Sequence, residues 1–116
     1  MGKIINEAER TLLWSVIDDT SDYQSVGSVT AHPGRIAILQ NQTDKPITFS
    51  IDGGSTACVT LATNGAVVLD LTANTGNSIN DHGDFLGENI QFAVKYTSDP
   101  PTDGSVYISL FYRKGE

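Results

Sequence analysis

The chain has 116 residues, a formal net charge of −7 and only 18% charged residues. This length is typical of one domain with its own core, and the scattered Lys and Arg residues argue against nucleic-acid and anionic-membrane partners. The single cysteine, Cys58, excludes an intrachain disulfide and a thiolate metal cluster, so we expect it to be a buried small apolar residue.

Residues 1–22 are predicted to form an N-terminal arm or added strand that grips a neighbouring protein. Asn6-Glu7-Ala8-Glu9 has the form of a helix N-cap with Glu at the third position, and apolar residues follow at helical spacing. Thr11 to Ile17 is equally suited to an outer strand. We favour a strand or extended arm over a short helix, because residues 23–116 read as a single β-sandwich domain. No apolar run here is long enough for a signal peptide or membrane span, so we expect a soluble protein made in a reducing compartment.

From about Tyr23 onward, apolar and polar positions alternate with the two-residue period of half-buried strands. The run Ile36 to Leu39 is apolar on both faces, which predicts a central strand. Thr48, Ser50 and Asp52 are expected to point to water. The residues expected to face the core are Ile47, Phe49, Ile51, Val59, Leu61, Val67, Leu69, Leu71, Ile90, Phe92, Val94, Tyr96, Val106, Ile108, Leu110 and Tyr112.

Polar turn sequences separate these runs. Asn64-Gly65 is the favoured pair for a two-residue hairpin, and Asp52-Gly53-Gly54 is a second tight-turn sequence. Strands interrupted by such turns at regular short intervals predict an all-β fold, a sandwich or barrel. The stretch Thr72 to Glu88 is rich in Asn, Gly and Asp and predicts a long loop, a feature that is often functional in compact domains.

The titratable residues offer only weak candidates for chemistry. Asp81-His82-Gly83-Asp84, followed by Glu88, could hold a hard cation such as calcium, but the spacing differs from that of an EF-hand and a solvated loop is the simpler interpretation. His32 lies in a Pro-Gly turn, where we expect a solvated side chain. No motif of a nucleophile elbow, phosphate loop or zinc protease is present, so we predict no catalytic residue, no metal ligand, no cofactor and no enzymatic activity. A further acidic cluster, expected to be solvated, consists of Asp18, Asp19 and Asp22.

Aromatic residues are the best candidates for a protein interface. Tyr107 and Phe111 share a strand face opposite Val106, Ile108 and Leu110, so they would point outward if the latter three form the core. The alternative for each aromatic residue separately is burial between the sheets or beneath the long loop. The candidate interface residues are Leu12, Trp14, Tyr23, Tyr107 and Phe111.

Four motifs occur in the order Asn41-Gln42-Thr43-Asp44, Ser50-Ile51-Asp52-Gly53, Leu69-Asp70-Leu71-Thr72-Ala73-Asn74 and Gly104-Ser105-Val106-Tyr107. In this order they resemble small virion proteins of tailed bacteriophages, most of all their capsid decoration (cement) proteins of jelly-roll type. The resemblance covers Arg35 to Tyr112. It implies an antiparallel two-sheet sandwich of about eight strands. It further implies synthesis in the host cytoplasm and a place on the capsid surface, where a homodimer or homotrimer binds the major capsid protein or other virion proteins. No functional residue is transferred from it.

Three other functions are compatible with the sequence. The chain could be a neck, tail or fibre component of the virion, or a carbohydrate- or receptor-binding module whose site is formed by aromatic residues and the loop from Thr72 to Glu88. A hydrolase using Asp81, Asp84 or Glu88 ranks last. A glycan-binding site would present two aromatic faces flat in a shallow groove, whereas a bracing protein would have interfacial aromatics and no deep polar pocket.

Overall fold

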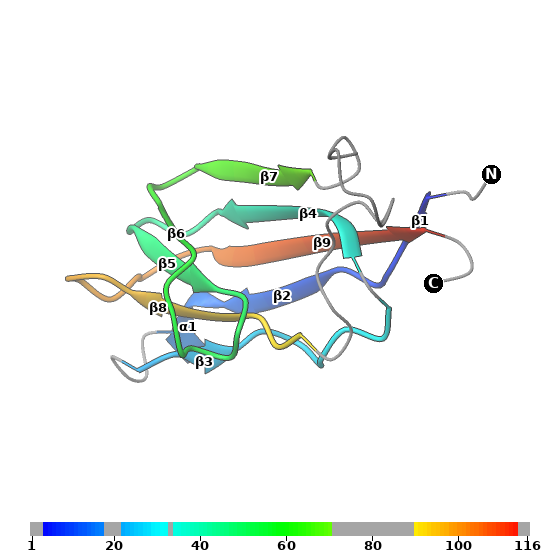
Figure 1. Cartoon of the computed structure of the whole chain (residues 1–116). Coiled ribbons are helices and arrows are strands. Elements are labelled where there is room, and N and C mark those ends of the chain that lie inside the picture. The colour runs from blue at the N-terminus through cyan, green and yellow to red at the C-terminus, as the bar shows by residue number, and fades with distance from the viewer. Residues whose placement is uncertain (1–3, 18–21, 33, 71–89, 114–116) are drawn as a thin grey trace.

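The computed structural model describes residues 4–17, 22–32, 34–70 and 90–113, whose strands form two antiparallel sheets packed face to face (Figure 1). The predicted two-sheet sandwich is therefore confirmed. Sheet A contains β1 (Ile4–Asn6), β2 (Arg10–Leu13), β4 (Gly34–Asn41), β7 (Ala66–Asp70) and β9 (Ser105–Arg113). Sheet B contains β3 (Gln24–Ser25), β5 (Ile47–Ser50), β6 (Val59–Leu61) and β8 (Ala93–Tyr96), and the short helix α1 (Trp14–Ile17) follows β2.

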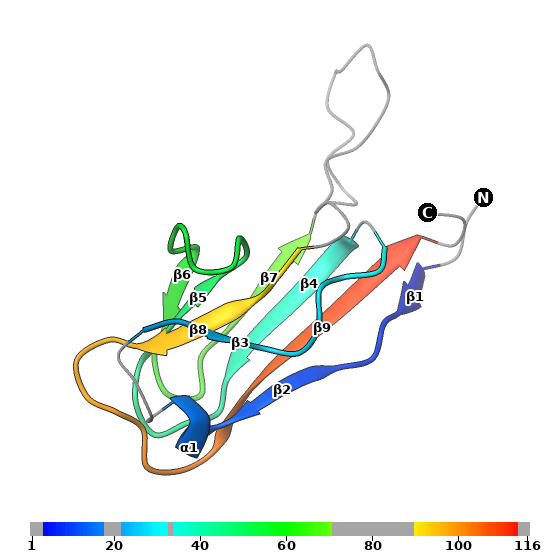
Figure 2. The ribbon, with the colours of Figure 1, turned by 90° about the horizontal axis from the view of Figure 1, so that it is seen from below.

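The strands are wound as a jelly roll. Four antiparallel pairs, β2 with β9, β3 with β8, β4 with β7 and β5 with β6, form one long ribbon. The ribbon is rolled so that β9 also pairs with β4, and β8 with β5. Figure 2 shows the resulting sheet A, with β9 between β4 and the two N-terminal strands. The central strand predicted around Ile36 to Leu39 is β4, which lies between β7 and β9.

The N-terminal segment contributes to the sandwich itself. Strands β1 and β2 pair in tandem with β9, where Asn6 lies opposite Phe111 and Arg10 lies opposite Ile108. The N-terminal side therefore contains one more residue than β9 between these two pairs, as in a β-bulge. The strand alternative holds for Arg10–Leu13, whereas the alternative helix with its N-cap at Asn6 does not form there, because Asn6 ends β1 and the single helical turn α1 begins only at Trp14. The side chain of Ile17, at the end of that turn, is fully buried in the core.

The core lies between the sheets and is built mainly by the residues predicted to face inward. Its fully buried members include Leu39, Ile47, Phe92, Ile108 and Leu110. Partly buried residues that pack against this core are Leu12, Ile51, Val59, Val67, Leu69, Ile90 and Tyr96. Leu71 lies outside the described residues.

Thr48 and Ser50, which were expected to point to water, are buried, so this prediction was wrong. The hydroxyl of Thr48 is 2.9 Å from that of Thr60 on the neighbouring strand β6. Ser50 Oγ donates to Asp52 Oδ1 at 2.6 Å and accepts the Gly54 N–H at 3.0 Å. The loop after β5 therefore folds back onto the strand and buries the Ser50 hydroxyl, which the two-residue period alone does not predict.

Asn64-Gly65 does not form the predicted hairpin, because β6 and β7 belong to different sheets. The Gly65 N–H donates to the Ala62 carbonyl at 2.8 Å, and Asn64 has a left-handed φ of 64°. The same turn bonds to the end of β4, where the Asn41 N–H donates to the Gly65 carbonyl at 2.9 Å. These bonds hold the turn that carries the chain from sheet B to sheet A.

Candidate functional site

The outer face of sheet A is the surface best suited to contact another protein. Val106, Ile108 and Leu110 of β9 are fully buried, so the alternating Tyr107, Ser109 and Phe111 point away from the core. On β4, Ile36 lies opposite Phe111, Ile38 opposite Ser109 and Gln40 opposite Tyr107. On β7, Val68 lies opposite Ile38.

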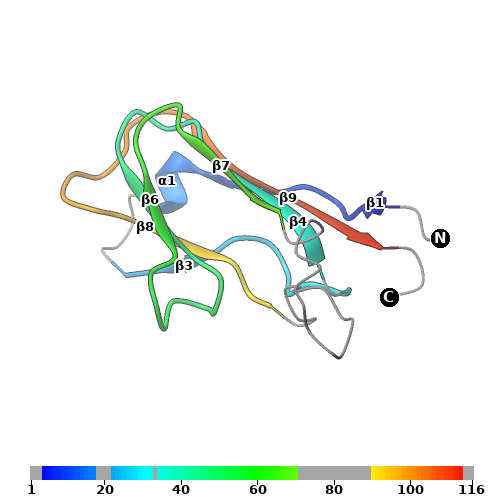
Figure 3. The same ribbon diagram turned by 45° about the horizontal axis from the view of Figure 1, so that its top comes forward.

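We call Ile36, Ile38, Val68, Tyr107 and Phe111 the outer patch. Val68 is 56% exposed, and the other four are half-buried because neighbouring strands bring their side chains against one another. Leu13 extends the patch onto β2, where it is 52% exposed and lies diagonally from Tyr107. Figure 3 shows the two sheets as layers, and no described segment runs over the outer side of sheet A.

The outer patch is electrically neutral in a chain that is otherwise strongly acidic. None of its five side chains is charged, and the polar neighbours Gln40, Ser109 and Thr11 are neutral, while Asp70 lies opposite Ile36 at the end of β7. At its margin Glu9 accepts a hydrogen bond from Ser109 Oγ at 3.3 Å. A partner docking here would bury apolar surface and uncharged hydrogen-bonding groups, not ion pairs.

The structure distributes the five predicted interface residues over different surfaces. Tyr107 and Phe111 belong to the outer patch, because the three core residues between and beside them are buried as the prediction required. Leu12 lies opposite Val106 and packs against the core. Trp14 is half-buried at the start of α1, and Tyr23 precedes β3 with the Lys95 Nζ 4.8 Å from its ring centroid.

Sequence reasoning missed the other members of the patch, Ile36, Ile38 and Val68, together with Leu13 at its margin. The available signal was the run from Ile36 to Leu39, apolar at every position. It was interpreted as burial on both faces, as in a covered central strand. In the structure the inward residues Ala37 and Leu39 are buried, while the outward ones remain partly open to solvent.

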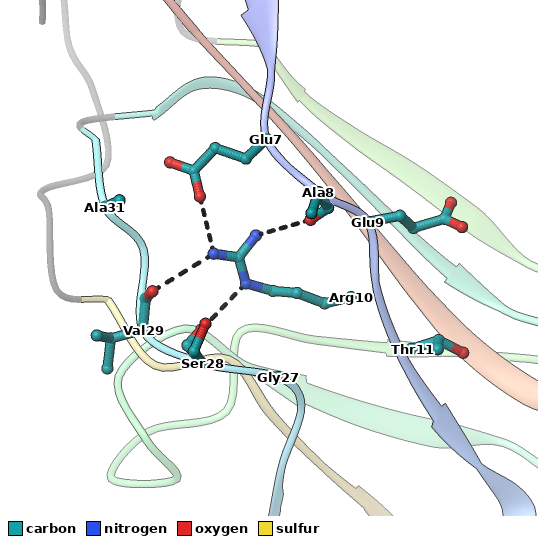
Figure 4. Close-up of a pocket in the computed structure, with 9 residues that line it drawn as sticks. All are labelled: Glu7, Ala8, Glu9, Arg10, Thr11, Gly27, Ser28, Val29 and Ala31. Atoms are coloured by element: carbon teal, nitrogen blue, oxygen red, sulfur yellow. Dashed lines mark hydrogen bonds and ion pairs between the residues drawn. The ribbon is translucent and has the colours of Figure 1, made fainter.

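A second feature is an open hollow of about 380 Å³ beside β2, shown in Figure 4. Arg10 Nη2 donates to Glu7 Oε1 at 2.9 Å, and both side chains are largely buried. Arg10 Nε donates to the Ser28 carbonyl at 3.1 Å, and Glu7 Oε2 accepts the His32 N–H at 3.1 Å. The guanidinium carbon also lies 5.8 Å from the Phe92 ring centroid.

These bonds make Arg10 and Glu7 a clamp between β2 and the segment that leads into β4. The remaining donor group of Arg10, Nη1, contacts the Ala8 carbonyl at 3.4 Å, and Nη2 is also 3.5 Å from the Val29 carbonyl. A guanidinium with this many protein acceptors is committed to the fold and is poorly placed to bind an external anion. None of the described residues that line the hollow is aromatic, so these residues do not supply the stacking surface expected of a glycan site.

The other titratable residues also have structural surroundings. The prediction that Cys58 is buried was wrong: it is exposed in the loop before β6, although partial desolvation and nearby Asp52 raise the pKa of its thiol. The His32 ring stacks on Tyr112 at a centroid distance of 3.8 Å, so it is not simply solvated as expected. Asp22 is exposed as predicted. Outside the described residues lie Asp18, Asp19 and the whole of 71–89, which contains Asp81, His82, Asp84 and Glu88.

The motifs on which the phage resemblance rests include hydrogen-bonded turns. Asn41 is fully buried, and its Nδ2 donates to the carbonyls of Lys45 and Leu61 at 2.8 and 2.9 Å. Its Oδ1 accepts the Thr43 N–H at 2.9 Å and the Thr43 hydroxyl at 2.6 Å. These bonds hold together the end of β4, the start of β5 and the end of β6.

Asp44 extends this arrangement to the loop before β9. Its Oδ1 accepts the Thr102 N–H at 2.8 Å, and its Oδ2 accepts the Thr102 hydroxyl at 2.5 Å. These hydrogen bonds to the ionised form lower the pKa of the Asp44 carboxyl below its ordinary value. The residues of this motif are thus used to fix turns at one end of the sandwich.

Comparisons with known proteins do not assign a family: no family model matches the sequence, and no curated protein matches it. Within the described residues, no helix is long and apolar enough to cross a membrane. The same residues contain no group of three His, Cys, Asp or Glu side chains placed to hold a metal ion. The outer patch is therefore the candidate site that the geometry supports best.

Proposed function

We propose that this chain is a structural protein of a tailed-bacteriophage particle that binds and braces the capsid shell as a decoration (cement) protein, without catalysis. The observation that carries the proposal is the outer patch, an apolar face on neighbouring strands of sheet A in an acidic protein. Contiguous exposed apolar surface of this kind is typical of protein interaction sites. The sequence motifs described above supply the phage setting, and the jelly-roll winding is the fold that this resemblance implies.

The proposed role follows from the energetics of assembly. A protein that binds the assembled shell, and not its separate subunits, stabilises the shell by mass action. The proposed partners are the major capsid protein or other virion proteins, together with further copies of this chain in a dimer or trimer. The proposed location is the capsid surface, after synthesis in the host cytoplasm.

Three structural features support a non-catalytic role. The buried polar side chains Arg10, Asn41 and Thr43 donate or accept hydrogen bonds within the fold, and none of the described ones has an unsatisfied buried side-chain atom. The hollow beside β2 is open and contains the Arg10–Glu7 clamp instead of an unpaired reactive group. The exposed thiol of Cys58 also fits a non-catalytic role, because desolvation and a nearby carboxylate raise its pKa and so disfavour the nucleophilic thiolate.

The test is to mix the full-length protein with phage particles that lack it and to image them by electron microscopy. Exposed Cys58 provides a single attachment point for a gold or fluorescent label on the side of sheet B. We expect label distributed over the shell and a higher temperature for release of the packaged DNA. Label confined to the neck or tail would assign the chain to that part of the virion instead, and particles without label would contradict a role in the virion.

A further inference from the structure

We propose that the outer patch is covered by a second copy of this chain, in a two-fold symmetric dimer whose sheets A stack face to face. The inference rests on the proposed function in one respect, that the outer patch is an interaction surface. It adds which partner occupies that surface and in what geometry.

The charge distribution favours a second copy over a basic partner. The chain carries a net charge of −7, yet none of the five side chains of the outer patch is charged. A basic protein would find the acidic residues Glu9 and Asp70 at the margin, the latter opposite Ile36, and charges that it placed over the five apolar side chains would lose water without compensation. A second copy brings five equally uncharged side chains, so docking of the two patches buries no charge within them, and the acidic residues Glu9 and Asp70 stay at the margin of the patch.

The polar groups around the patch are suited to pairing with themselves. Gln40, Ser109 and Tyr107 each contain both a hydrogen-bond donor and an acceptor. In a two-fold symmetric interface the same patch of both copies is in contact. Each donor of one copy therefore faces a patch that also contains acceptors. A surface with only donors or only acceptors would lack this property.

The size of the face matches a weak, reversible dimer. The nine residues of β9 span about 30 Å, and four neighbouring strands span about 15–20 Å. The face therefore offers about 500 Å² per copy, or about 1,000 Å² in total, which is at the lower end of specific interfaces. We expect a dissociation constant of about 10–100 μM.

The decisive experiment is sedimentation equilibrium of the full chain at low and high salt. Two molecules of charge −7 repel one another, and salt screens this repulsion, so self-association through a neutral face should become roughly three- to tenfold tighter between about 0.02 and 0.5 M NaCl. Association through ion pairs would weaken over the same range.

Two substitutions localise the interface. Val68→Glu places a negative charge at the most exposed member of the patch, and we expect at least tenfold weaker dimerisation. Ser98→Glu adds the same charge at an exposed position between β8 and β9 and should leave the dimer unchanged. Far-ultraviolet circular dichroism and thermal melting check that both variants remain folded.

Tyr107→Thr separates stacking of the faces from pairing of the β7 edges, which is another symmetric arrangement that sheet A offers. Tyr107 lies on β9, which β4 separates from β7, so edge pairing would not involve its ring. Thr keeps a high strand propensity while removing the ring. We expect at least fivefold weaker dimerisation, and an unchanged dimer would overturn the proposed geometry.

Cysteine cross-linking gives a second readout. Ser109 lies at the centre of the face, so Ser109→Cys in a Cys58→Ser background should form an intermolecular disulfide under mild oxidation. The native Cys58 belongs to the loop before β6 of sheet B and should not cross-link in the same dimer. Cross-linking through Cys58 but not through residue 109 would contradict face-to-face stacking.

The outcomes also separate this inference from the proposed function. A strict monomer at the highest attainable concentration would overturn the dimer, and if that monomer still bound phage shells through the patch, the function would stand with the capsid protein as occupant. A dimer that fails to bind any phage particle would sustain the inference and contradict the function.

Discussion

The two faces of sheet A are built by the same strands from similar residues, yet only one of them is covered. On the inner face Ala37, Leu39 and Ile108 are fully buried against sheet B. On the outer face Ile36, Ile38 and Phe111 are no less apolar and remain partly open to solvent.

The two faces differ in the burial and hydrogen bonding of their polar side chains. The inner side contains Arg10 and Asn41, both buried and both hydrogen-bonded to several partners within the chain. The outer side contains Gln40 and Ser109, which are partly exposed. The comparison teaches that apolar content does not identify the core face of this sheet, whereas buried and fully bonded polar groups do.

The largest expected effect comes from the polar clamp on the inner side. Glu7→Gln should destabilise the protein by about 3–5 kcal/mol, because it leaves the largely buried Arg10 guanidinium without its charged partner. Glu9→Gln, two residues away on the exposed side, should change stability by less than about 0.5 kcal/mol. Urea denaturation measures both, and similar losses in the two variants would break the distinction between the faces.

A smaller but still substantial loss is expected at Asn41. Asn41→Ala should cost about 3 kcal/mol, because it removes the side chain that binds the buried Leu61 carbonyl and the buried Thr43 N–H. Gln42→Ala changes an exposed neighbour and serves as the control, with an expected change within about 0.5 kcal/mol. Thermal unfolding at neutral pH gives both values. If Asn41→Ala unfolds at the same temperature as the wild type, this polar cluster does not hold the turns together.

The comparison is sharpened by removing the same methyl group from each face. Ile108→Val on the inner face should cost about 1 kcal/mol, because the vacated space cannot be filled by water. Ile38→Val on the outer face should cost less than about 0.5 kcal/mol when measured on dilute protein. Repeating the denaturation at high concentration should enlarge the loss for Ile38→Val alone, since only that side chain lies in the proposed dimer interface.

The smallest effect concerns the exposed loops. The Thr102 hydrogen bonds lower the folded-state pKa of Asp44, so their contribution to stability is complete above the ordinary pKa near 3.8 and is lost as the pH falls through the lower folded value. Asp44→Asn should therefore reduce the dependence of stability on pH below about 4. Asp99→Asn, an exposed carboxylate in the same loop as Thr102, is the control. If the stability of Asp44→Asn falls with pH below about 4 as steeply as that of the wild type, this role is contradicted.

Much of the fold was predictable from the sequence because period-two patterns report directly on which side of a strand is covered. The alternation of Val106, Ile108 and Leu110 with Tyr107 and Phe111 predicted both faces of β9 correctly. The pattern failed where a neighbouring loop covers the outer side of a strand, as at Ser50 beneath the turn at Gly54. Such coverage depends on the path of the loop, which alternation does not encode.

The candidate site was only partly predictable. Tyr107 and Phe111 were found because an aromatic opposite a core position is unusual enough to notice. Ile36, Ile38 and Val68 were missed because a strand that is apolar on both faces has two physical explanations, burial between layers and an uncovered interaction face. Asn64-Gly65 was misread for a similar reason, since local turn preferences do not specify whether the next strand returns to the same sheet.

The position of β9 has a consequence for how the protein is made. β9 follows every other described strand along the chain, yet it pairs with β1, β2 and β4. During translation these three strands emerge from the ribosome well before β9, their shared partner. Until β9 is synthesised, their apolar residues remain exposed to solvent. Folding should therefore be largely post-translational and limited by long-range pairing, and a nascent chain arrested before Ser105 should be bound by chaperones or digested by proteases until synthesis resumes.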